Sequence, residues 1–271
     1  FSKKDIWEIK KIEIYSEKLK NSKIFNFEKN QTNLFYMVKN EILNKSLNKE
    51  LIKSKYFKKI IIKKNDFYKK ILDEKKYNLI INCESDNFIS NKYFSKKIDK
   101  DYNNLAYTTI LKHKKLDNNT AIQIFTKLGP IAFLPISNTE TSVVYSLEIK
   151  NKIYQNSEIV DLIYNHNPKY KIEKILEISN FKLKSSNLRN YYYKNILAFG
   201  DLLHKIHPLA GQGFNMTIRD IRILSEIIQN KIDLGIQLDE FILEEFEKKV
   251  KHTNFAFSSG IDFIYEFFSY N

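Results

Sequence analysis

Apolar and polar positions along the chain change their spacing twice, which divides the chain into regions of different predicted structure. Between residues 36 and 51, apolar residues recur at helical spacing, and apolar runs at 59–63 and 77–82 have the length of short buried strands. The next region contains β-prone runs separated by polar turns, at 105–111, 121–125, 131–134 and 142–147. The pattern therefore predicts an α/β region followed by an antiparallel sheet.

The last third of the chain adds one strand pattern and two helical patterns. Residues 196–199 form a short apolar run, and an apolar helical stripe follows over 218–228. A second stripe covers 246–268. Stripes at this spacing usually face a core, so we expect a packed helix pair; a helix that binds a membrane surface is the alternative.

The composition is that of a globular protein with a large excess of lysine. Among 271 residues, 45 are Lys or Arg and 32 are Asp or Glu, which gives a net charge of +13, but only three residues are arginine. Proteins that read nucleic acids rely on the arginine fork, so we expect no nucleic-acid partner. The excess reflects either a compositional bias or attraction to an anionic membrane surface.

Three further features concern the compartment. The single cysteine, Cys83, cannot form an internal disulfide and has no cluster of metal ligands around it, which favours a reducing compartment and predicts no metal site. The apolar runs are too short to span a bilayer. We therefore expect a cytoplasmic protein, with peripheral attachment to the inner membrane face as a variant. Because the chain opens at Phe1 without an initiating Met, we also expect a piece of a longer protein.

Glycine clusters in one stretch that carries candidate chemistry. Three of the six glycines, Gly200, Gly211 and Gly213, lie within 14 residues, together with two of the five histidines. The pattern predicts a strand that ends at Gly200 and Asp201, then a loop, then a helix that starts near Asn215. Such glycines let the backbone approach a ligand, the helix N–H groups would face an anion or a ring edge, and Asp201 could accept hydrogen bonds from ligand hydroxyls. An ordinary turn and helix cap is the alternative.

The whole stretch resembles the second flavin-binding motif of the flavoprotein aromatic hydroxylases. It is most similar to the ubiquinone-biosynthesis hydroxylases, whose pattern is G-D-A-A-H-x-x-H-P-[LIV]-A-G-Q-G-x-N-x-G-x-x-D. The matching positions are Gly200, Asp201, His204, His207, Pro208, Leu209, Ala210, Gly211, Gln212, Gly213, Asn215 and Asp220. The stretch departs from the pattern at Leu202, Leu203 and Thr217.

Weaker resemblances precede this stretch in the family's order. Residues 119–125 and 129–136 are similar to N-T-A-x-Q-x-F and to G-P-[LM]-A-[LF]-L-P-[LM], which are strands of the substrate domain in that family. Asp86 to Ser90 stand where the family has D-G-x-x-S, with Asn87 in place of the glycine. Because asparagine tolerates positive φ, we expect the family's turn to be kept at Asn87.

The resemblance implies a mixed α/β and α+β fold like that of p-hydroxybenzoate hydroxylase. The family's first Rossmann motif, G-x-G-x-x-G, occurs nowhere in the chain, so we expect an incomplete FAD-binding domain. No repeat or linker separates the domains, which predicts that they are interleaved. The expected division is a substrate-domain sheet at 1–32 and 100–187, a partial FAD-binding domain at 33–99 and 188–230, and C-terminal helices at 231–271.

By resemblance, the protein is an FAD-dependent monooxygenase that uses O2 and NAD(P)H or another reductant to hydroxylate a polyprenyl phenol. The resemblance assigns flavin contacts to Gly200, Asp201, Pro208, Gly211, Gln212, Gly213, Phe214 and Asn215. It assigns catalytic positions to His207 and Pro208 and the substrate pocket to Phe133 and Pro135. His204 and His207 are either acid–base groups or residues of loop packing and the pyrophosphate side, and we expect Arg219 and Asp220 to hold the helix surface.

Two rival functions remain open on the sequence alone. A basic remnant of the flavin fold could act without catalysis at a membrane surface or in complex assembly, and a reductase or halogenase could share the fold. If the hydroxylase interpretation is right, the 271-residue chain should be colourless when purified. In the complete enzyme, Asp201→Ala should weaken FAD binding more than His204→Ala, because His204 is expected in an exposed loop.

Overall fold

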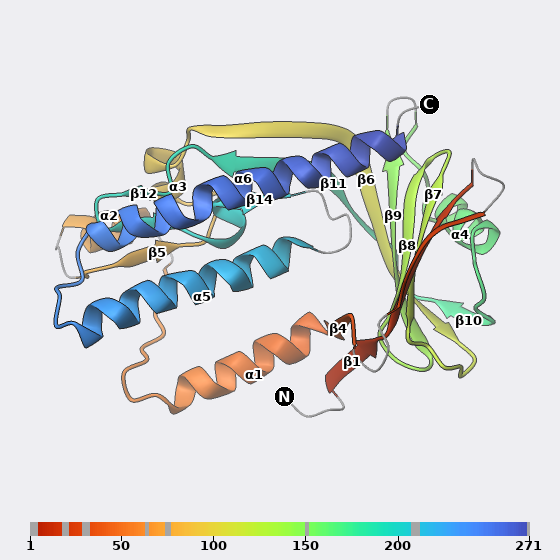
Figure 1. The fold of residues 1–271 in the computed structure, drawn as a ribbon, viewed down its shortest axis with the longest axis horizontal. Coiled ribbons are helices and arrows are strands. Elements are labelled where there is room, and N and C mark those ends of the chain that lie inside the picture. Colours follow the sequence, from red (N-terminus) through yellow and green to blue (C-terminus); the bar gives the residue numbers. More distant parts are fainter. Residues whose placement is uncertain are drawn as a thin grey trace. The chain divides into compact units, whose positions relative to one another are not determined.

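The computed structural model describes residues 5–17, 22–28, 33–62, 65–73, 77–149, 152–206 and 212–269. Contacts divide the chain into two compact units: a sheet unit, residues 1–59 and 103–182, and a helical unit, residues 60–102 and 183–271. The chain passes from one unit to the other three times: between residues 59 and 60, within the long strand β6 (Lys97–His113) and within β11 (Ser179–Leu188) (Figure 1). The two units are thus interleaved in sequence. By contacts, residues 33–59 group with the sheet and residues 231–271 with the helical unit, so the boundaries differ from those expected.

The sheet unit is built around a sheet with strand order β6-β9-β8-β7-β2-β3, and β10 pairs with β6. Its elements are β1 (Ile6–Ile9), β2 (Lys11–Ser16), β3 (Ser22–Glu28), β4 (Phe35–Val38), α1 (Asn40–Lys53), β7 (Thr120–Thr126), β8 (Gly129–Pro135), β9 (Glu140–Glu148), α4 (Asn156–Asn165) and β10 (Ile172–Ile175). β2 and β7 are parallel, whereas β6, β7, β8 and β9 form antiparallel pairs. The antiparallel sheet predicted for 105–147 is confirmed.

One face of this sheet carries the core of the unit. Phe133, Tyr145 and Leu147 are fully buried, and they pack in one cluster with Ile159 and Ile163 of α4. Alternate residues of each strand point to this face, as the pleat requires. The hairpin from β7 to β8 depends on Gly129, whose φ of +136° brings its backbone against the carbonyl of Ser146.

The helical unit combines a small sheet with two long helices. Its elements are α2 (Asn65–Asp73), β5 (Ile80–Asn82), α3 (Phe88–Tyr93), β12 (Tyr192–Tyr193), β13 (Ile196–Ala198), the 3-10 turn η2 (Gly200–Leu202), β14 (His204–Lys205), α5 (Gln212–Asp233) and α6 (Phe241–Ser269). β5 and β13 are parallel, and β12 is antiparallel to β13. Figure 1 shows α5 and α6 side by side, and Leu224 and Phe246 bury one core with Leu197 of β13. The predicted helix pair is confirmed.

Three of the sequence assignments need correction. Residues 36–38 belong to β4, and the predicted helix begins only at Asn40. Residues 59–62 form no strand, because no described segment pairs with them, and Ile61 is 74% exposed. The strand expected at 77–82 is limited to 80–82.

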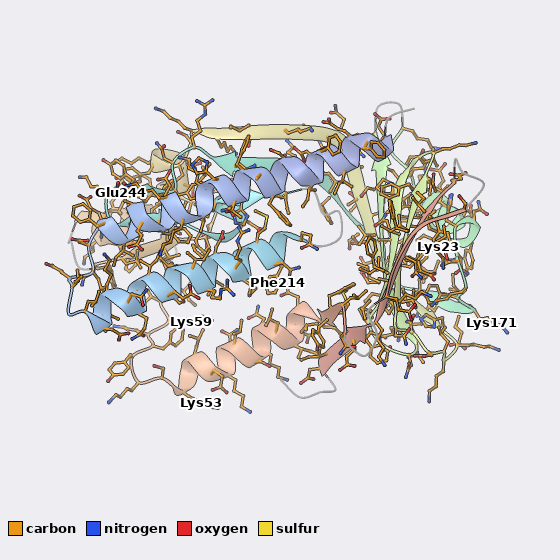
Figure 2. The ribbon with its side chains drawn as sticks, viewed as in Figure 1. Lys23, Lys53, Lys59, Lys171, Phe214 and Glu244 are labelled. Carbon is orange, nitrogen blue, oxygen red and sulfur yellow. The ribbon has the colours of Figure 1, made fainter. Side chains whose placement is uncertain are left out.

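Three further features of the described residues concern the lysines, membrane-spanning helices and metal ligands. The lysines labelled in Figure 2, such as Lys23, Lys53 and Lys171, project from separate elements, in keeping with a scattered basic excess. No helix in the described ranges is long and apolar enough to cross a membrane. Within the same ranges, no group of three or more His, Cys, Asp or Glu side chains is arranged to hold a metal ion.

Candidate functional site

The carboxyl ends of β5 and β13 form the first part of the candidate site. The N–H of Phe199 donates to the carbonyl of Asn82 over 2.9 Å, which keeps the two parallel strands in step at their ends. Gly200 follows with φ of +61°, and a Cβ built there would meet no atom within 4 Å. Asp201 is exposed in the turn η2. Ligands of α/β sheets bind beyond the carboxyl ends of parallel strands, and Asp201 lies there as the sequence predicted.

A polar network closes the end of β5 beside this turn. The Asn82 amide donates to Ser90 Oγ over 2.7 Å, and the Asn87 amide donates to Asn82 Oδ1 over 2.6 Å. Asn87 also accepts from the Ser90 N–H and so caps α3. Its φ is −90°, so the expected positive-φ turn is wrong: the side chain caps the helix, which requires extended backbone.

Negative charge gathers around these strand ends. The pKa of the Cys83 thiol is raised by desolvation and then by the charges of Glu84 and Asp201. The charge of Asp201 is the smallest of these causes, and it acts on Cys83 because the residues after β13 lie near those after β5. A pair of carboxylates repels phosphate and attracts hydroxyl donors, so this side of the site suits a polyol better than a phosphate.

The first turn of α5 forms the second part of the site. The helix begins at Gln212, three residues before the predicted start, and therefore includes Gly213, Phe214 and Asn215. Phe214, labelled in Figure 2, is largely exposed. Asn215 donates to Gln212 Oε1 over 3.1 Å. In general, the N–H groups of a first helical turn have no partner within the helix and can bind an anion. His207, Pro208 and Gly211 lie outside the described residues, so their assigned roles remain predictions.

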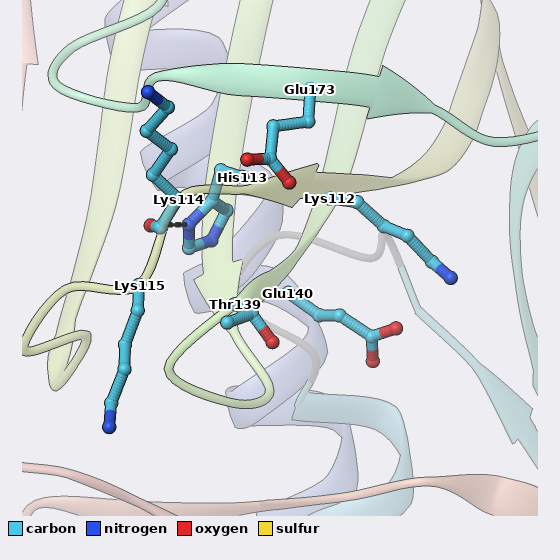
Figure 3. Close-up of a pocket in the computed structure, with 7 residues that line it drawn as sticks. All are labelled: Lys112, His113, Lys114, Lys115, Thr139, Glu140 and Glu173. Carbon is cyan, nitrogen blue, oxygen red and sulfur yellow. Dashed lines mark hydrogen bonds between the residues drawn. The ribbon is translucent and has the colours of Figure 1, made fainter.

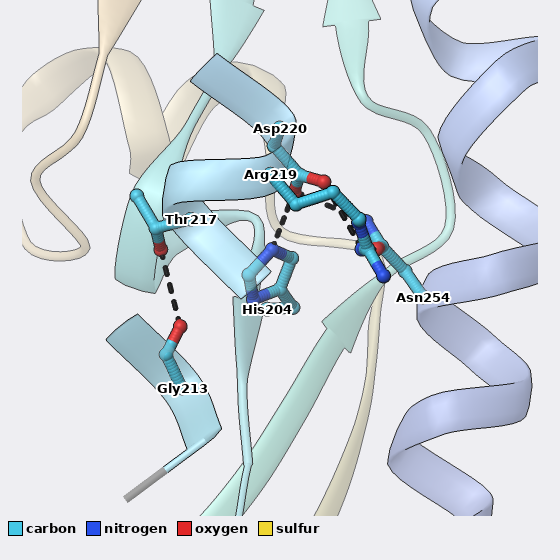
Figure 4. Close-up of polar contacts among 6 residues, drawn as sticks. All are labelled: His204, Gly213, Thr217, Arg219, Asp220 and Asn254. Carbon is cyan, nitrogen blue, oxygen red and sulfur yellow. Dashed lines mark hydrogen bonds and ion pairs between the residues drawn. The ribbon is translucent and has the colours of Figure 1, made fainter. Parts of the chain in front are cut away.

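His204 and Asp220 form a buried pair that the sequence did not predict. His204 is 2% exposed and Asp220 is 1% exposed, and His204 Nε2 lies 2.7 Å from Asp220 Oδ2 (Figure 4). His204 belongs to β14, which pairs with β11, so it is not in an exposed loop. The expectation that Asp220 holds the helix surface is also wrong, because Asp220 lies on the buried face of α5.

The sheet unit offers a separate apolar surface. Phe133 is fully buried and stacks on Tyr170 with ring centroids 5.8 Å apart, and Pro135 is buried as well. Their assignment to the substrate pocket is therefore corrected, because both lie on the core face of β8. The opposite face is only partly buried. Its neighbouring residues across β7, β8, β9 and β6 are Gln123, Ala132, Val144 and Thr108, followed by Leu134, Ser142 and Ile110.

A pocket of about 390 Å³ also opens on the sheet unit, at the end of β6. Lys112, Lys114 and Lys115 line it, but Figure 3 shows their side chains pointing in different directions. His113 is buried there, with Nδ1 hydrogen-bonded to the Lys114 carbonyl and Nε2 to Thr141 Oγ1, both at 3.0 Å. The three lysines therefore do not converge on one point in this pocket, and both ring nitrogens of His113 already have hydrogen-bond partners.

Comparison with known proteins agrees with this geometry. Residues 122–233 match the model of the FAD binding domain family. Ubiquinone biosynthesis monooxygenase COQ6 of Dictyostelium discoideum is 28% identical over 244 residues, and 3-demethoxyubiquinol 3-hydroxylase of Escherichia coli is 32% identical over 155 residues. The chain is thus similar in sequence to ubiquinone-biosynthesis monooxygenases over the matched residues. These matches cover 71% and 55% of this chain but only 49% and 40% of the two relatives, so the chain spans about half of their length or less.

Solved structures support the fold. PqsL of Pseudomonas aeruginosa, titled a probable FAD-dependent monooxygenase, has a TM-score of 0.70 at 12% identity and covers 98% of this chain and 79% of its own. The flavin-dependent brominase Bmp2 has a TM-score of 0.72 at 10% identity and covers 98% and 74%. At such identities the likeness shows the fold and does not choose between hydroxylase and halogenase. The two sequence relatives are both named as monooxygenases or hydroxylases of ubiquinone biosynthesis.

Proposed function

We propose that this chain forms the later FAD-binding part and the substrate sheet of a monooxygenase that hydroxylates a polyprenyl phenol in ubiquinone biosynthesis. The observation that supports this proposal most is the position of Gly200 and Asp201: they follow β13 beside the end of the parallel strand β5, and a Cβ at Gly200 would meet no atom within 4 Å. The relatives named as ubiquinone-biosynthesis hydroxylases support the substrate class.

The described residues fit one side of FAD. Asp201, exposed beyond β13, would accept hydrogen bonds from the ribityl hydroxyls, and the missing side chain at Gly200 would let the cofactor approach the backbone. The N-terminus of α5 would stabilise negative charge beside it, since the helix dipole and the free N–H groups both favour an anion. When bound, FAD supplies the redox chemistry that activates O2.

The partly buried sheet face fits the phenol. Ala132, Leu134 and Val144 offer small and aliphatic contacts, which suit a ring with a prenyl chain. The reductant, NAD(P)H or another donor, and peripheral membrane attachment on the cytoplasmic side belong to the same proposal, since the substrate is lipid-soluble.

The test is a turnover assay of the full-length protein with FAD, a reductant and a polyprenyl phenol under ¹⁸O2. The proposal expects one labelled oxygen atom in the phenol ring for each product molecule, detected by mass spectrometry. A product that is halogenated or unlabelled, or consumption of reductant with no change in the phenol, would contradict it.

A further inference from the structure

The pair of His204 and Asp220 belongs to a buried polar network that joins three elements of the helical unit. Asp220 of α5 receives hydrogen bonds at 2.7 Å from His204 of β14, at 3.1 Å from Arg219, and at 3.3 Å from Asn254 of α6. Arg219 also donates to the side chain of Asn254. Asn254 is fully buried, and Tyr191, which immediately precedes β12, is hydrogen-bonded to it. Figure 4 shows the converging side chains.

This network is costly to interrupt. A carboxylate as buried as that of Asp220 is tolerated only when it is paired and hydrogen-bonded, so removing His204 would leave one of its oxygens short of a donor. His204 Nδ1 has no hydrogen-bond partner among the described residues. The imidazole is therefore held through Nε2, and its bond to Asp220 determines where the ring lies.

The pair has a defined place relative to the candidate site. His204 lies at the end of the described chain that enters the segment before α5, and Asp220 lies two turns into α5. The two residues are 16 positions apart in the sequence, and the hydrogen bond between them links a residue before α5 to a residue within α5. The first turn of α5, from Gln212 to Asn215, lies between these two bonded residues in the sequence.

We propose that His204 is a positioning residue, which holds the first turn of α5 in the place from which it would contact the flavin. The inference rests on the proposed function for the identity of the ligand, but not for the positioning itself. His204 acts through Asp220 and needs no contact with the cofactor.

The test compares His204→Leu with His204→Gln, whose side-chain amide can still donate to Asp220. Two readouts are measured on the full chain: amide hydrogen exchange at residues 216–220, the second turn of α5, and the affinity for added FAD. Losing a hydrogen bond to a charged group typically changes an equilibrium ten- to hundredfold. We expect H204L to speed exchange and weaken FAD binding by such factors, and H204Q to restore both to within about threefold.

Asn187→Leu is the matched control. Asn187 is the β11 partner of His204 in the strand register and donates to Ser258 of α6 over 3.0 Å, but it makes no bond to α5. The proposal expects N187L to leave exchange at 216–220 unchanged. Unchanged exchange in H204L, or equal effects of H204L and H204Q, would overturn it. If the unmutated chain binds no FAD, the proposed function fails, and the exchange measurements still decide the positioning role.

Discussion

The N–H of Phe199 and the carbonyl of Asn82 are joined by a hydrogen bond of 2.9 Å, although the two residues are far apart in the sequence. This bond continues the parallel pairing of β13 with β5 by one step and brings Gly200 and Asp201 beside the network of Asn82 and Asn87. A site made of two strand ends therefore depends on a register set in the buried part of the sheet.

The assignment of sheet faces predicts unequal effects at two neighbouring positions. Phe133→Ala should lower the free energy of unfolding of the sheet unit by about 3–5 kcal/mol, because it leaves a cavity in the core. Leu134→Ala, on the partly buried face, should cost about 1 kcal/mol. Urea unfolding followed by fluorescence of Trp7, whose indole N–H donates to the Asn118 carbonyl within this unit, measures both. Equal losses would show that the faces are wrongly assigned.

Two glycines should respond in opposite directions to alanine. At Gly129 a Cβ would lie 2.0 Å from the Ser146 carbonyl oxygen, and its φ is strained for any side chain, so Gly129→Ala should disrupt the pairing of β8 with β9. At Gly260, inside α6, a Cβ meets nothing within 4 Å. Gly260→Ala should stabilise the helix by about 0.5–1 kcal/mol. Melting curves of the two variants check this, and a stable G129A would refute the described hairpin.

The carboxylate of Glu13 predicts an acid-dependent loss of stability. Although desolvation raises its pKa, hydrogen bonds from Lys23, Tyr15 and Lys11 outweigh this effect and lower the pKa from 4.5 to about 2. A depressed folded-state pKa means that the contribution is present above pH 4.5 and is lost as the pH falls towards 2. Glu13→Gln should therefore cost about 1.5 kcal/mol at pH 7 and flatten the stability curve in that window.

Glu28→Gln is the control for this pH dependence. Glu28 lies on the neighbouring strand β3, is largely exposed, and reaches Lys11 only at 3.7 Å. An exposed pair of this kind contributes little, so its removal should leave both the stability and its pH dependence unchanged. If unfolding in urea at pH 3 and pH 7 gave the same difference between E13Q and the unmutated chain, the argument for Glu13 would fail.

The sequence was sufficient for some of these features because their signals are local. The runs between 105 and 147 alternate with polar turns, and Gly200 and Asp201 follow an apolar strand. The sequence could not show which face of β8 packs in the core. Ile131, Ala132, Phe133 and Leu134 are all apolar, so this strand lacks the alternation of apolar and polar residues that would mark the buried face.

The sequence also could not show which polar residues are buried. His204 and Asp220 are partners across 16 positions, and only the fold brings them together. Nothing in the residue types marks His204 as buried, because histidine occurs on surfaces and in cores alike. The capping role of Asn87 was readable in principle: an Asn before Phe88 and Ile89 is a common helix start.

In the full-length protein, Asp201→Ala should weaken FAD binding ten- to hundredfold, since it removes a charge-assisted hydrogen bond of about 1.5–3 kcal/mol. Asp161→Ala, an exposed aspartate of α4, should leave the affinity unchanged. Removing the side chain of His204 should also weaken FAD binding, but indirectly, because it would displace the first turn of α5. Flavin titration of the variants decides the point, and full affinity in D201A would remove the main contact assigned here.

We propose that this chain holds the ribityl and ring side of FAD, and a competition titration with flavin and nucleotide fragments measures this. The purified chain should be colourless, because it contains no G-x-G-x-x-G sequence for the adenosine pyrophosphate. Added FAD should nevertheless bind saturably, with quenching of flavin fluorescence. Riboflavin should compete for the site, and AMP should not. No saturable flavin binding, or equal competition by AMP, would contradict the account.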